Sequence, residues 1–315
     1  MPRRVKVGVI GVGSLGQHHA RIYSQMPDIE FVGICDTNAD RARDIAAQYG
    51  TKVFPELLDL ARAIDAASVV VPTDLHHSIS LALMEHGVHL LVEKPIAATT
   101  AEAEEMVSVS RRKNVILQVG HVERFNPVLS VLESSTKKPR FIEAHRLAPY
   151  PPPREGACPR GTEVSVVLDL MIHDLEIILH LVGSRVAEIH AVGLPVLSRS
   201  EDIANVRLRF ENGCIANVTA SRISPERMRK IRVFLDDAYL SLDYQSQSGE
   251  MQRKTAAGIE REEIPIEKGE PLANELESFI GCVARRDAPV VSGEHAADAL
   301  RLAVQIIQRM REGAS

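Results

Sequence analysis

The sequence predicts an α/β protein of two domains, in which a doubly wound parallel sheet precedes an α+β domain with an open, mostly antiparallel sheet. The chain has 315 residues, and domains of about 100–200 residues make two the natural expectation. Short apolar strand patterns alternate with helix patterns up to about residue 122, and longer strands of alternating polarity follow. We therefore expect one domain over residues 1–122 and a second over residues 123–315.

The first domain is predicted from short apolar runs that are separated by helix patterns. The runs cover residues 5–10, 31–35, 68–71, 88–92 and 115–119. The helix patterns cover residues 15–26, 38–49, 55–63, 76–86 and 100–113. Strands that alternate with helices form βαβ units around a parallel sheet. The continuous apolar character of the runs suits a sheet that is covered on both faces.

The second domain begins with a proline-rich, arginine-containing segment, residues 139–160, and continues with a long helix pattern over 163–182. The strand patterns cover residues 203–210, 214–220, 230–235 and 239–244, and the final helix patterns cover residues 273–285 and 294–312. These helices suffice to cover one face of a sheet. Because an uncovered apolar face must be buried elsewhere, we expect the other face to meet a second subunit, in a homodimer or a homotetramer.

Charge and composition exclude several classes of protein. The formal net charge is −5 and the sequence pI is about 6.2, whereas nucleic-acid-binding domains are usually basic. We expect no nucleic-acid partner and no membrane partner, since no apolar run is long enough to cross a bilayer. The cysteines are scattered, at Cys35, Cys158, Cys214 and Cys282. Reduced, scattered thiols fit a cytoplasmic protein.

A glycine-rich loop follows the first predicted strand and opens the first predicted helix. It has the pattern GxGxxG, and the residues that we expect to contact a dinucleotide are Gly11, Gly13, Ser14, Leu15 and Gly16. In Rossmann domains such glycines allow a tight turn, a close approach of the pyrophosphate and close helix packing. Asp36 ends the second predicted strand, where a carboxylate accepts hydrogen bonds from the adenosine ribose. Since that carboxylate repels a 2′-phosphate, the sequence predicts NAD rather than NADP.

Two further places in the sequence carry groups suited to catalysis. Lys94 ends the predicted strand over residues 88–92, and ligands of open α/β sheets bind beyond the carboxyl ends of strands. The pattern over 163–182 is apolar almost all round, yet four polar side chains recur on one face: Asp169, His173, Glu176 and His180. A carboxylate four residues before a histidine can orient an imidazole that accepts a hydroxyl proton. A solvated helix edge and a metal site are the alternatives, and we expect no metal.

The order and spacing of these motifs resemble the glucose–fructose oxidoreductase, inositol dehydrogenase and MocA family over nearly the whole chain. The motifs are the glycine loop, Pro72-Thr73 with His76, Glu93-Lys94-Pro95, and Asp169 with His173. The resemblance implies a Rossmann domain and an open-sheet domain. It further implies that Lys94, Asp169 and His173 form the catalytic group. Thr73, His76, Glu93 and Lys94 would lie along the cofactor.

Two segments are similar to one subgroup of that family. Residues 164–174 lack the Gly-Gly pair that many members carry, and residues 120–127 read GHVERFNP. Both forms resemble the enzymes that oxidise carbon 3 of UDP-N-acetylglucosamine and supply the 3-keto sugar nucleotide to a partner aminotransferase, in the synthesis of a lipid A precursor. The resemblance implies substrate contacts by Arg124 and Asn126.

The proline-rich segment offers independent groups for a nucleotide diphosphate. Planar guanidinium groups suit a diphosphate, and the arginines that we expect to contribute are Arg146, Arg154 and Arg160. Tyr150 could stack on a uracil base. A solvated basic loop is the alternative interpretation of this segment.

Three functions remain open at this stage. The first is oxidation of a sugar nucleotide by NAD. The second is an inositol, polyol or simple-sugar dehydrogenase, whose substrate is uncharged. The third is an NAD-binding sensor without turnover, which needs neither a base nor Lys94.

Overall fold

The computed structural model describes residues 3–133, 138–153, 159 and 161–313. The chain divides into two compact units, one made of residues 1–125 and 270–297, the other of residues 126–269 and 298–315. The boundary near residue 125 lies close to the expected one, but residues 270–297 belong to the first unit and not to the second. Each unit has its own hydrophobic core and is described separately below.

The first unit contains a parallel sheet with the strand order β3-β2-β1-β4-β5-β6, which we call the Rossmann sheet. Its strands are β1 (Val5–Ile10), β2 (Ile29–Cys35), β3 (Lys52–Val53), β4 (Ala66–Val69), β5 (His89–Glu93) and β6 (Leu117–Gly120). The connecting helices are α1 (Gly16–Gln25), α2 (Ala39–Tyr49), α3 (Leu57–Ala61), α4 (Thr73–Glu85) and α5 (Thr100–Lys113). The order reverses between β1 and β4, and ligands of doubly wound sheets bind at this switch point.

Local signals in the sequence explain where these helices begin and end. Asn38 caps α2, because its side chain accepts a hydrogen bond from the backbone of Arg41. Thr99 and Glu102 form a capping box at the start of α5, which satisfies two backbone N–H groups that the helix leaves free. Gly50 ends α2 in the left-handed conformation, at a φ of 66°, a geometry that glycine adopts without strain.

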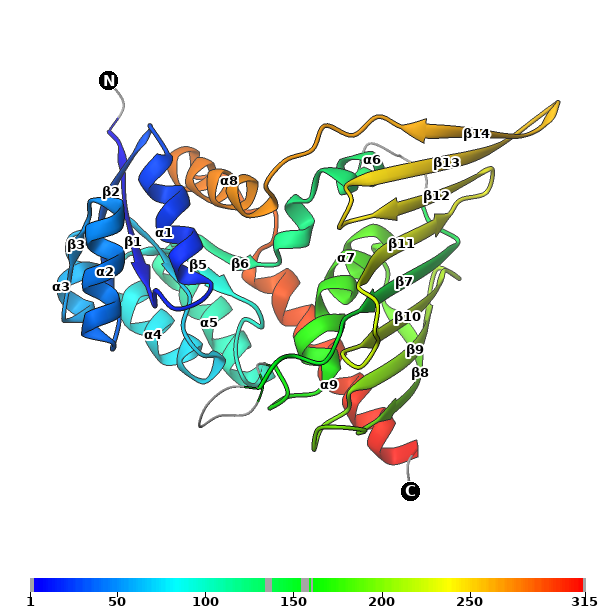
Figure 1. Cartoon of the computed structure of the whole chain (residues 1–315), viewed down its shortest axis with the longest axis horizontal. Helices are drawn as coiled ribbons and strands as arrows, with labels where there is room; N and C mark the ends of the chain where they lie inside the picture. Colours follow the sequence, from blue (N-terminus) through cyan, green and yellow to red (C-terminus); the bar gives the residue numbers. More distant parts are fainter. Residues whose placement is uncertain (1–2, 134–137, 154–158, 160, 314–315) are drawn as a thin grey trace. The chain divides into compact units, whose positions relative to one another are not determined.

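Helix α8 (Pro271–Arg285) completes the core of the first unit. Leu276, Phe279 and Ile280 pack in one cluster with Val7 of β1 and Ala20 of α1. Figure 1 shows α8 beside α1. The sequence shows that this helix has an apolar face but not which sheet that face covers, so the expected second-domain helix in fact packs on the Rossmann sheet.

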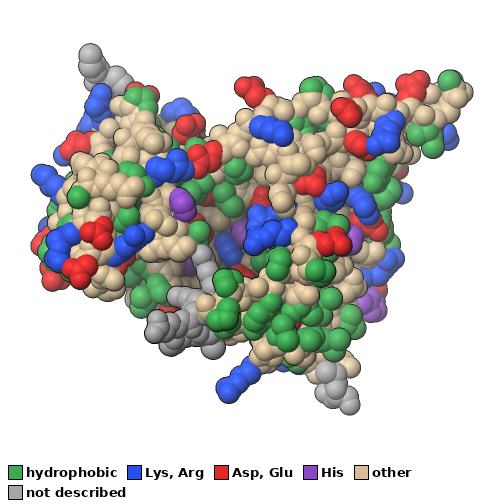
Figure 2. Space-filling view, viewed as in Figure 1, with side chains coloured by type: hydrophobic (Ala, Val, Ile, Leu, Met, Phe, Trp, Pro, Cys, Tyr) green, Lys and Arg blue, Asp and Glu red, His purple; other side chains and the backbone are tan. Residues whose placement is uncertain are grey.

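The second unit contains a sheet with the strand order β14-β13-β12-β11-β7-β10-β9-β8, which we call the open sheet. Strands β7 and β10 pair in parallel, and the other neighbours are antiparallel. The strands are β7 (Phe141–Leu147), β8 (Val186–Leu194), β9 (Ile203–Phe210), β10 (Ile215–Ser221), β11 (Met228–Phe234), β12 (Ala238–Asp243), β13 (Ser248–Thr255) and β14 (Gly258–Ile264). Figure 2 shows acidic and basic side chains interspersed over β13 and β14.

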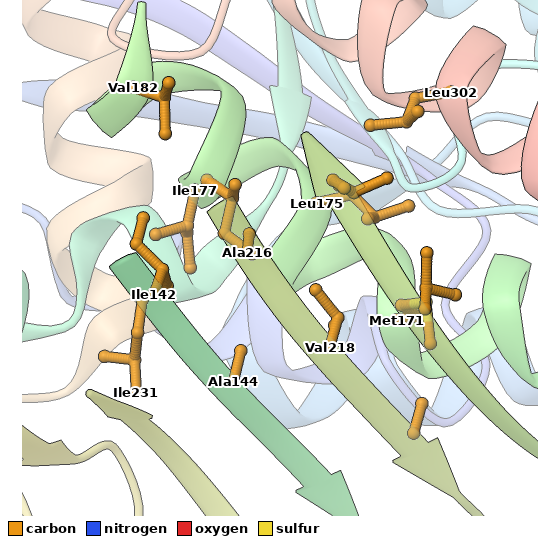
Figure 3. Close-up of a cluster of buried hydrophobic side chains, with 14 of the residues drawn as sticks. Ile142, Ala144, Met171, Leu175, Ile177, Val182, Ala216, Val218, Ile231 and Leu302 are labelled. Carbon is orange, nitrogen blue, oxygen red and sulfur yellow. The ribbon is translucent and has the colours of Figure 1, made fainter. Parts of the chain in front are cut away.

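One face of the open sheet is covered by α7 (Ile172–Val182) and by α9 (Gly293–Gly313), which Figure 1 places on the same side of the strands. Strand β9 alternates as predicted, with Val206 and Leu208 buried and Arg207 and Arg209 exposed. Figure 3 shows Leu175 of α7 and Leu302 of α9 pointing into this core. Among the described residues of this unit, no helix covers the opposite face.

Short helices connect the larger elements. They are η1 (Val122–Phe125), η2 (Pro127–Leu129), α6 (Ser130–Glu133) and the π-helical turn η3 (Val167–Met171), which leads directly into α7. The helix pattern over 163–182 therefore begins later than predicted, and residues 163–165 lie outside the helix. Ser165 explains the late start, because its hydroxyl accepts from the backbone of Val167 and its carbonyl accepts from Leu168 and Asp169.

Candidate active site

The glycine loop between β1 and α1 has the geometry of a dinucleotide-binding turn. Gly11 has a φ of +82°, and a Cβ atom there would lie 2.8 Å from the carbonyl carbon of Val70. A Cβ atom at Gly16 would lie 2.8 Å from the carbonyl carbon of Gly11. These two positions require glycine because the backbones touch. At Gly13 nothing lies within 4 Å of the added atom, so the backbone is open to a pyrophosphate.

The open side of this loop is also solvent-exposed at Ser14 and Leu15. The first turn of α1 follows at once, and free backbone N–H groups at a helix N-terminus bind anions. Of the loop residues named from the sequence, Gly13, Ser14 and Leu15 are exposed at the switch point of the Rossmann sheet. Gly11 and Gly16 are buried and allow the tight turn. The groups present fit the pyrophosphate of NAD.

Asp36 follows β2 and faces the same loop. Its Oδ2 accepts a hydrogen bond from the backbone N–H of Val12 at 2.6 Å, and its Oδ1 accepts from that of Asn38 at 2.8 Å. Arg41, the nearby cation that could favour a phosphate, donates to the carbonyl of Val12 and to the side chain of Gln17. The carboxylate of Asp36 is thus fixed beside the glycine loop, at the position where Rossmann domains carry the acidic residue for the ribose.

Glu93 is the last residue of β5, and Lys94 follows it. The partner of Glu93 is His19, a histidine that the sequence did not single out as functional. Nε2 of His19 lies 3.3 Å from Oε1 of Glu93. Burial alone would raise the pKa of Glu93, but the hydrogen bond from His19 and the positive charge of Lys94 outweigh it and lower that pKa. His19 is buried and the adjacent His18 is exposed, so the amphipathic pattern of α1 was the signal that distinguishes them.

His76 does not offer an open surface to a cofactor. It is 1% exposed, and its ring nitrogens lie 2.9 Å from the carbonyl oxygen of Pro95 and 3.0 Å from that of Val71. Burial lowers its pKa. His76 thereby joins the loop after β4 to the turn after β5, at the residue that follows Lys94. Thr73 begins α4 at the switch point and is half-buried.

A buried polar layer behind the Rossmann sheet was not predicted. Tyr23 and Ser68 share a hydrogen bond of 2.9 Å, and Gln118 donates to the carbonyl of Glu275 at 3.3 Å. Glu275 of α8 is fully buried, and neither carboxyl oxygen has a hydrogen-bond partner among the described residues. Burial first, and the negative charge of Glu93 second, raise the pKa of Glu275 well above its usual value. The sequence gives no sign that a charged residue of an amphipathic helix faces inward.

In the second unit, the polar stripe of the long helix pattern separates into different environments. Asp169 on η3 and His173 on α7 are half-buried, whereas Glu176 is buried. His180 is exposed, and its Nε2 lies 3.7 Å from Oε1 of Glu133. Asp169 and His173 are therefore the two members of the stripe that are neither buried nor fully exposed. No three His, Cys, Asp or Glu side chains form a metal-binding group within the described part of the chain.

The residues expected to contact the substrate lie in different environments. Arg146 is buried and forms a salt bridge with Asp174, so its charge is used within the core and not for a diphosphate. Asn126 caps η2, and its amide donates to the carbonyl of Tyr244. Arg124 is 5% exposed, which leaves little surface for a substrate. Arg154 and Arg160, which we expected to bind a diphosphate, lie outside the described residues. Tyr150 shares a hydrogen bond with Ser198.

An open glycine loop with a fixed carboxylate beside it, and a histidine one helical turn from an aspartate, are features typical of an NAD-dependent dehydrogenase that acts on a hydroxyl group. Two family models match the chain: an oxidoreductase family with an NAD-binding Rossmann fold over residues 5–121, and the GFO/IDH/MocA C-terminal domain over residues 137–241. The chain belongs to the GFO/IDH/MocA family.

Relatives of known activity cover the whole length of the chain. UDP-N-acetylglucosamine 3-dehydrogenase of Acidithiobacillus ferrooxidans is 33% identical over 309 residues, which are 96% of each chain. A solved structure of that enzyme superposes with a TM-score of 0.92 over 98% of this chain and 99% of the other, at 32% identity. Myo-inositol 2-dehydrogenase of Thermotoga maritima is 26% identical and covers 95% of this chain and 94% of its own.

A solved complex of levoglucosan dehydrogenase with NADH has a TM-score of 0.87 at 18% identity and covers 98% of each chain. This likeness concerns the fold. The cofactor of the protein is NAD, and its substrates carry a hydroxyl group on a sugar or a related ring. No helix among the described residues is long and apolar enough to cross a membrane.

Proposed function

We propose that this dehydrogenase oxidises the C3 hydroxyl of UDP-N-acetylglucosamine to a ketone. The observation that carries the proposal is the half-buried pair Asp169 and His173, one helical turn apart, in a chain that is 33% identical to UDP-N-acetylglucosamine 3-dehydrogenase along nearly its whole length. NAD, when bound, accepts the hydride from the sugar carbon. The chain itself has to bind the sugar nucleotide, orient its ring and remove the hydroxyl proton.

His173 is the proposed base. A neutral imidazole accepts a proton near physiological pH, and Asp169 lies four residues earlier in the chain, where a carboxylate can orient the ring and stabilise its charged form. Lys94 is proposed to donate a hydrogen bond to the reacting oxygen and to stabilise negative charge as it develops. Within its own unit, the backbone N–H of Lys94 donates to Oε2 of Glu93 at 3.3 Å, and His76 contacts the carbonyl of the next residue, Pro95.

A nucleotide diphosphate would supply binding energy far from the reacting carbon, and such binding positions a sugar ring for transfer. We propose Arg154 and Arg160 as its ligands, because Arg146 is committed to Asp174. The test measures NADH absorbance with UDP-N-acetylglucosamine, free N-acetylglucosamine and myo-inositol, and UDP binding by calorimetry at moderate salt. Turnover of the nucleotide and competition by UDP support the proposal, whereas turnover of the free sugar without UDP binding refutes it.

A polyol dehydrogenase is the second candidate function. The internal pairing of Arg146 favours it, because this pairing removes one of the arginines expected for a diphosphate, and an uncharged polyol needs none. A myo-inositol dehydrogenase also matches 95% of the chain. Good turnover of myo-inositol in the same assay would select this function.

We also propose a homodimer or homotetramer that forms through the uncovered face of the open sheet, and a sugar aminotransferase that consumes the ketone. A ketone beside an acetamido group is a suitable substrate for transamination. Free cysteines at Cys35, Cys214 and Cys282 fit the cytoplasm. Light scattering at micromolar concentration tests the oligomer, and a coupled assay with an amino donor tests the partner.

A further inference from the structure

The backbone of Gly161 lies directly against the carboxyl group of Asp169. A Cβ atom built on Gly161 would lie 2.7 Å from Cγ and 3.1 Å from Oδ1 of Asp169, and closer still to Oδ2. The three atoms nearest to that position all belong to this carboxyl group. Gly161 is buried and has a φ of +83°. The absence of a side chain at residue 161 therefore creates the space that the Asp169 carboxylate occupies.

The turn that contains Gly161 is held by a buried arginine. Nη1 of Arg222 donates to the carbonyl oxygen of Gly161 at 2.5 Å and to that of Val164 at 2.9 Å. The hydroxyl of Ser200 donates to the carbonyl of Val164 at 2.8 Å and to that of Thr162 at 3.2 Å. The carbonyls of Gly161, Thr162 and Val164 are thus held by charged and polar donors.

Arg222 is itself fixed. It follows β10 and is 2% exposed, and its Nε donates to Oδ1 of the fully buried Asp202 at 2.8 Å. The other oxygen of Asp202 accepts from three backbone N–H groups, those of Val196, Leu197 and Ser198. A buried arginine with its donors satisfied in this way keeps one orientation, because any other would leave a charge without partners.

We propose that Gly161, on the turn anchored by Arg222 and Asp202, is a positioning residue that fixes the carboxylate of Asp169. An aspartate side chain on a helix has several staggered rotamers. The backbone of Gly161 blocks part of that space, and the turn cannot retreat because Arg222 holds it. The role of the carboxylate in catalysis rests on the proposed function; the contact itself does not. Errors of about 1 Å in the position of a catalytic group can cost about 10²-fold in rate.

The first experiment measures stability and needs no substrate. Gly161→Ala and its matched control Gly213→Ala are each made in the native chain and in an Asp169→Ala background. Gly213 has a φ of +86° and nothing within 4 Å of its added Cβ atom, so it reports backbone strain alone. We expect Gly161→Ala to lower the Tm by at least about 2 °C more than the control in the native chain. In the Asp169→Ala background this excess should disappear.

The proposal would be overturned if Gly161→Ala lowered the Tm beyond the control by the same amount in both backgrounds, or failed to fold in both. The added Cβ atom would then clash with a group other than the Asp169 carboxylate. If Gly161→Ala folded only in the Asp169→Ala background, that result would support the proposal most strongly. A crystal structure of Gly161→Ala should show the carboxylate in another rotamer, and an unmoved carboxylate would also overturn the proposal.

The second experiment measures turnover. Gly161→Ala should lower kcat by about 10–100-fold with the Kd for NAD unchanged, and Gly213→Ala should change both by less than about twofold. In the Asp169→Ala background Gly161→Ala should cost no further activity. If the native protein turns over none of the candidate substrates, the proposed function fails, and the stability cycle still decides whether Gly161 positions Asp169.

Discussion

The guanidinium group of Arg146 donates two hydrogen bonds to the carboxylate of Asp174, from Nε to Oδ2 at 2.8 Å and from Nη2 to Oδ1 at 3.1 Å. Both side chains are almost fully buried, and the arginine lies over the ring of Tyr244 at 5.9 Å from its centroid. Asp174 directly follows His173, so this pair joins β7 to the first turn of α7.

Arg146→Met should lower the free energy of unfolding by about 3–5 kcal/mol, because it leaves the carboxylate of Asp174 buried without its partner. Replacing both residues, with Arg146→Met and Asp174→Leu, should recover most of this loss. Urea unfolding measures both effects. The control is Arg209→Met, which breaks the exposed pair with Glu188 and should change stability little. If the Arg146→Met protein were as stable as the native protein and had lost only UDP binding, Arg146 would have to be a ligand of the diphosphate.

Asp36→Ala should narrow or invert the preference for NAD over NADP, because it removes the carboxylate that repels a 2′-phosphate. The measurement is the Kd of each cofactor by calorimetry. Asp40→Ala is the matched control, since Asp40 is an exposed carboxylate of the same segment that pairs with Arg43. Equal affinity of the native protein for the two cofactors would contradict the role given to Asp36.

His173→Ala and Lys94→Ala should each lower kcat by about 10²–10⁴-fold, the usual cost of removing a general acid or base. Both variants should still bind NAD, because neither side chain belongs to the loop for the adenosine half. His180→Ala is the control on the same helix, where the side chain is exposed. Near-native turnover by His173→Ala would place the base elsewhere.

Glu275→Gln should gain stability relative to the native protein as the pH rises. The pKa of Glu275 is raised by burial and by Glu93, so the folded state retains a proton that the unfolded chain releases above its ordinary pKa of about 4.3. That part of the stability is complete at lower pH and is lost as the pH rises towards the folded-state pKa.

The check is the difference in Tm between Glu275→Gln and the native protein, measured from pH 5 to pH 8. The variant lacks the titrating group, so the difference should move steadily in its favour over this range. Glu277→Gln, on the exposed side of the same helix, should show a constant difference. A constant difference for Glu275→Gln would mean that this carboxyl group titrates normally.

The features that the sequence predicted are those set by neighbours in the chain. Strand and helix alternation, the glycine loop with Asp36, and the alternation along β9 depend on residues a few positions apart. The features that it missed depend on a partner from a distant segment. Nothing near Arg146 in the sequence shows that Asp174 will neutralise it, and the same holds for His19 with Glu93. The sequence predicted the apolar face of α8, but not that this face packs on the Rossmann sheet.

The assignment of α8 to the first unit bears on how the protein is made. A ribosome releases the chain from the N-terminus at about 5–20 residues per second, and residues 1–125 emerge long before α8. Until then the surface that receives Leu276 and Phe279 has no cover, and the other unit likewise waits for residues 298–315. Both cores take residues from beyond position 269, so a nascent chain stalled near residue 269 would present apolar surface for chaperones to bind.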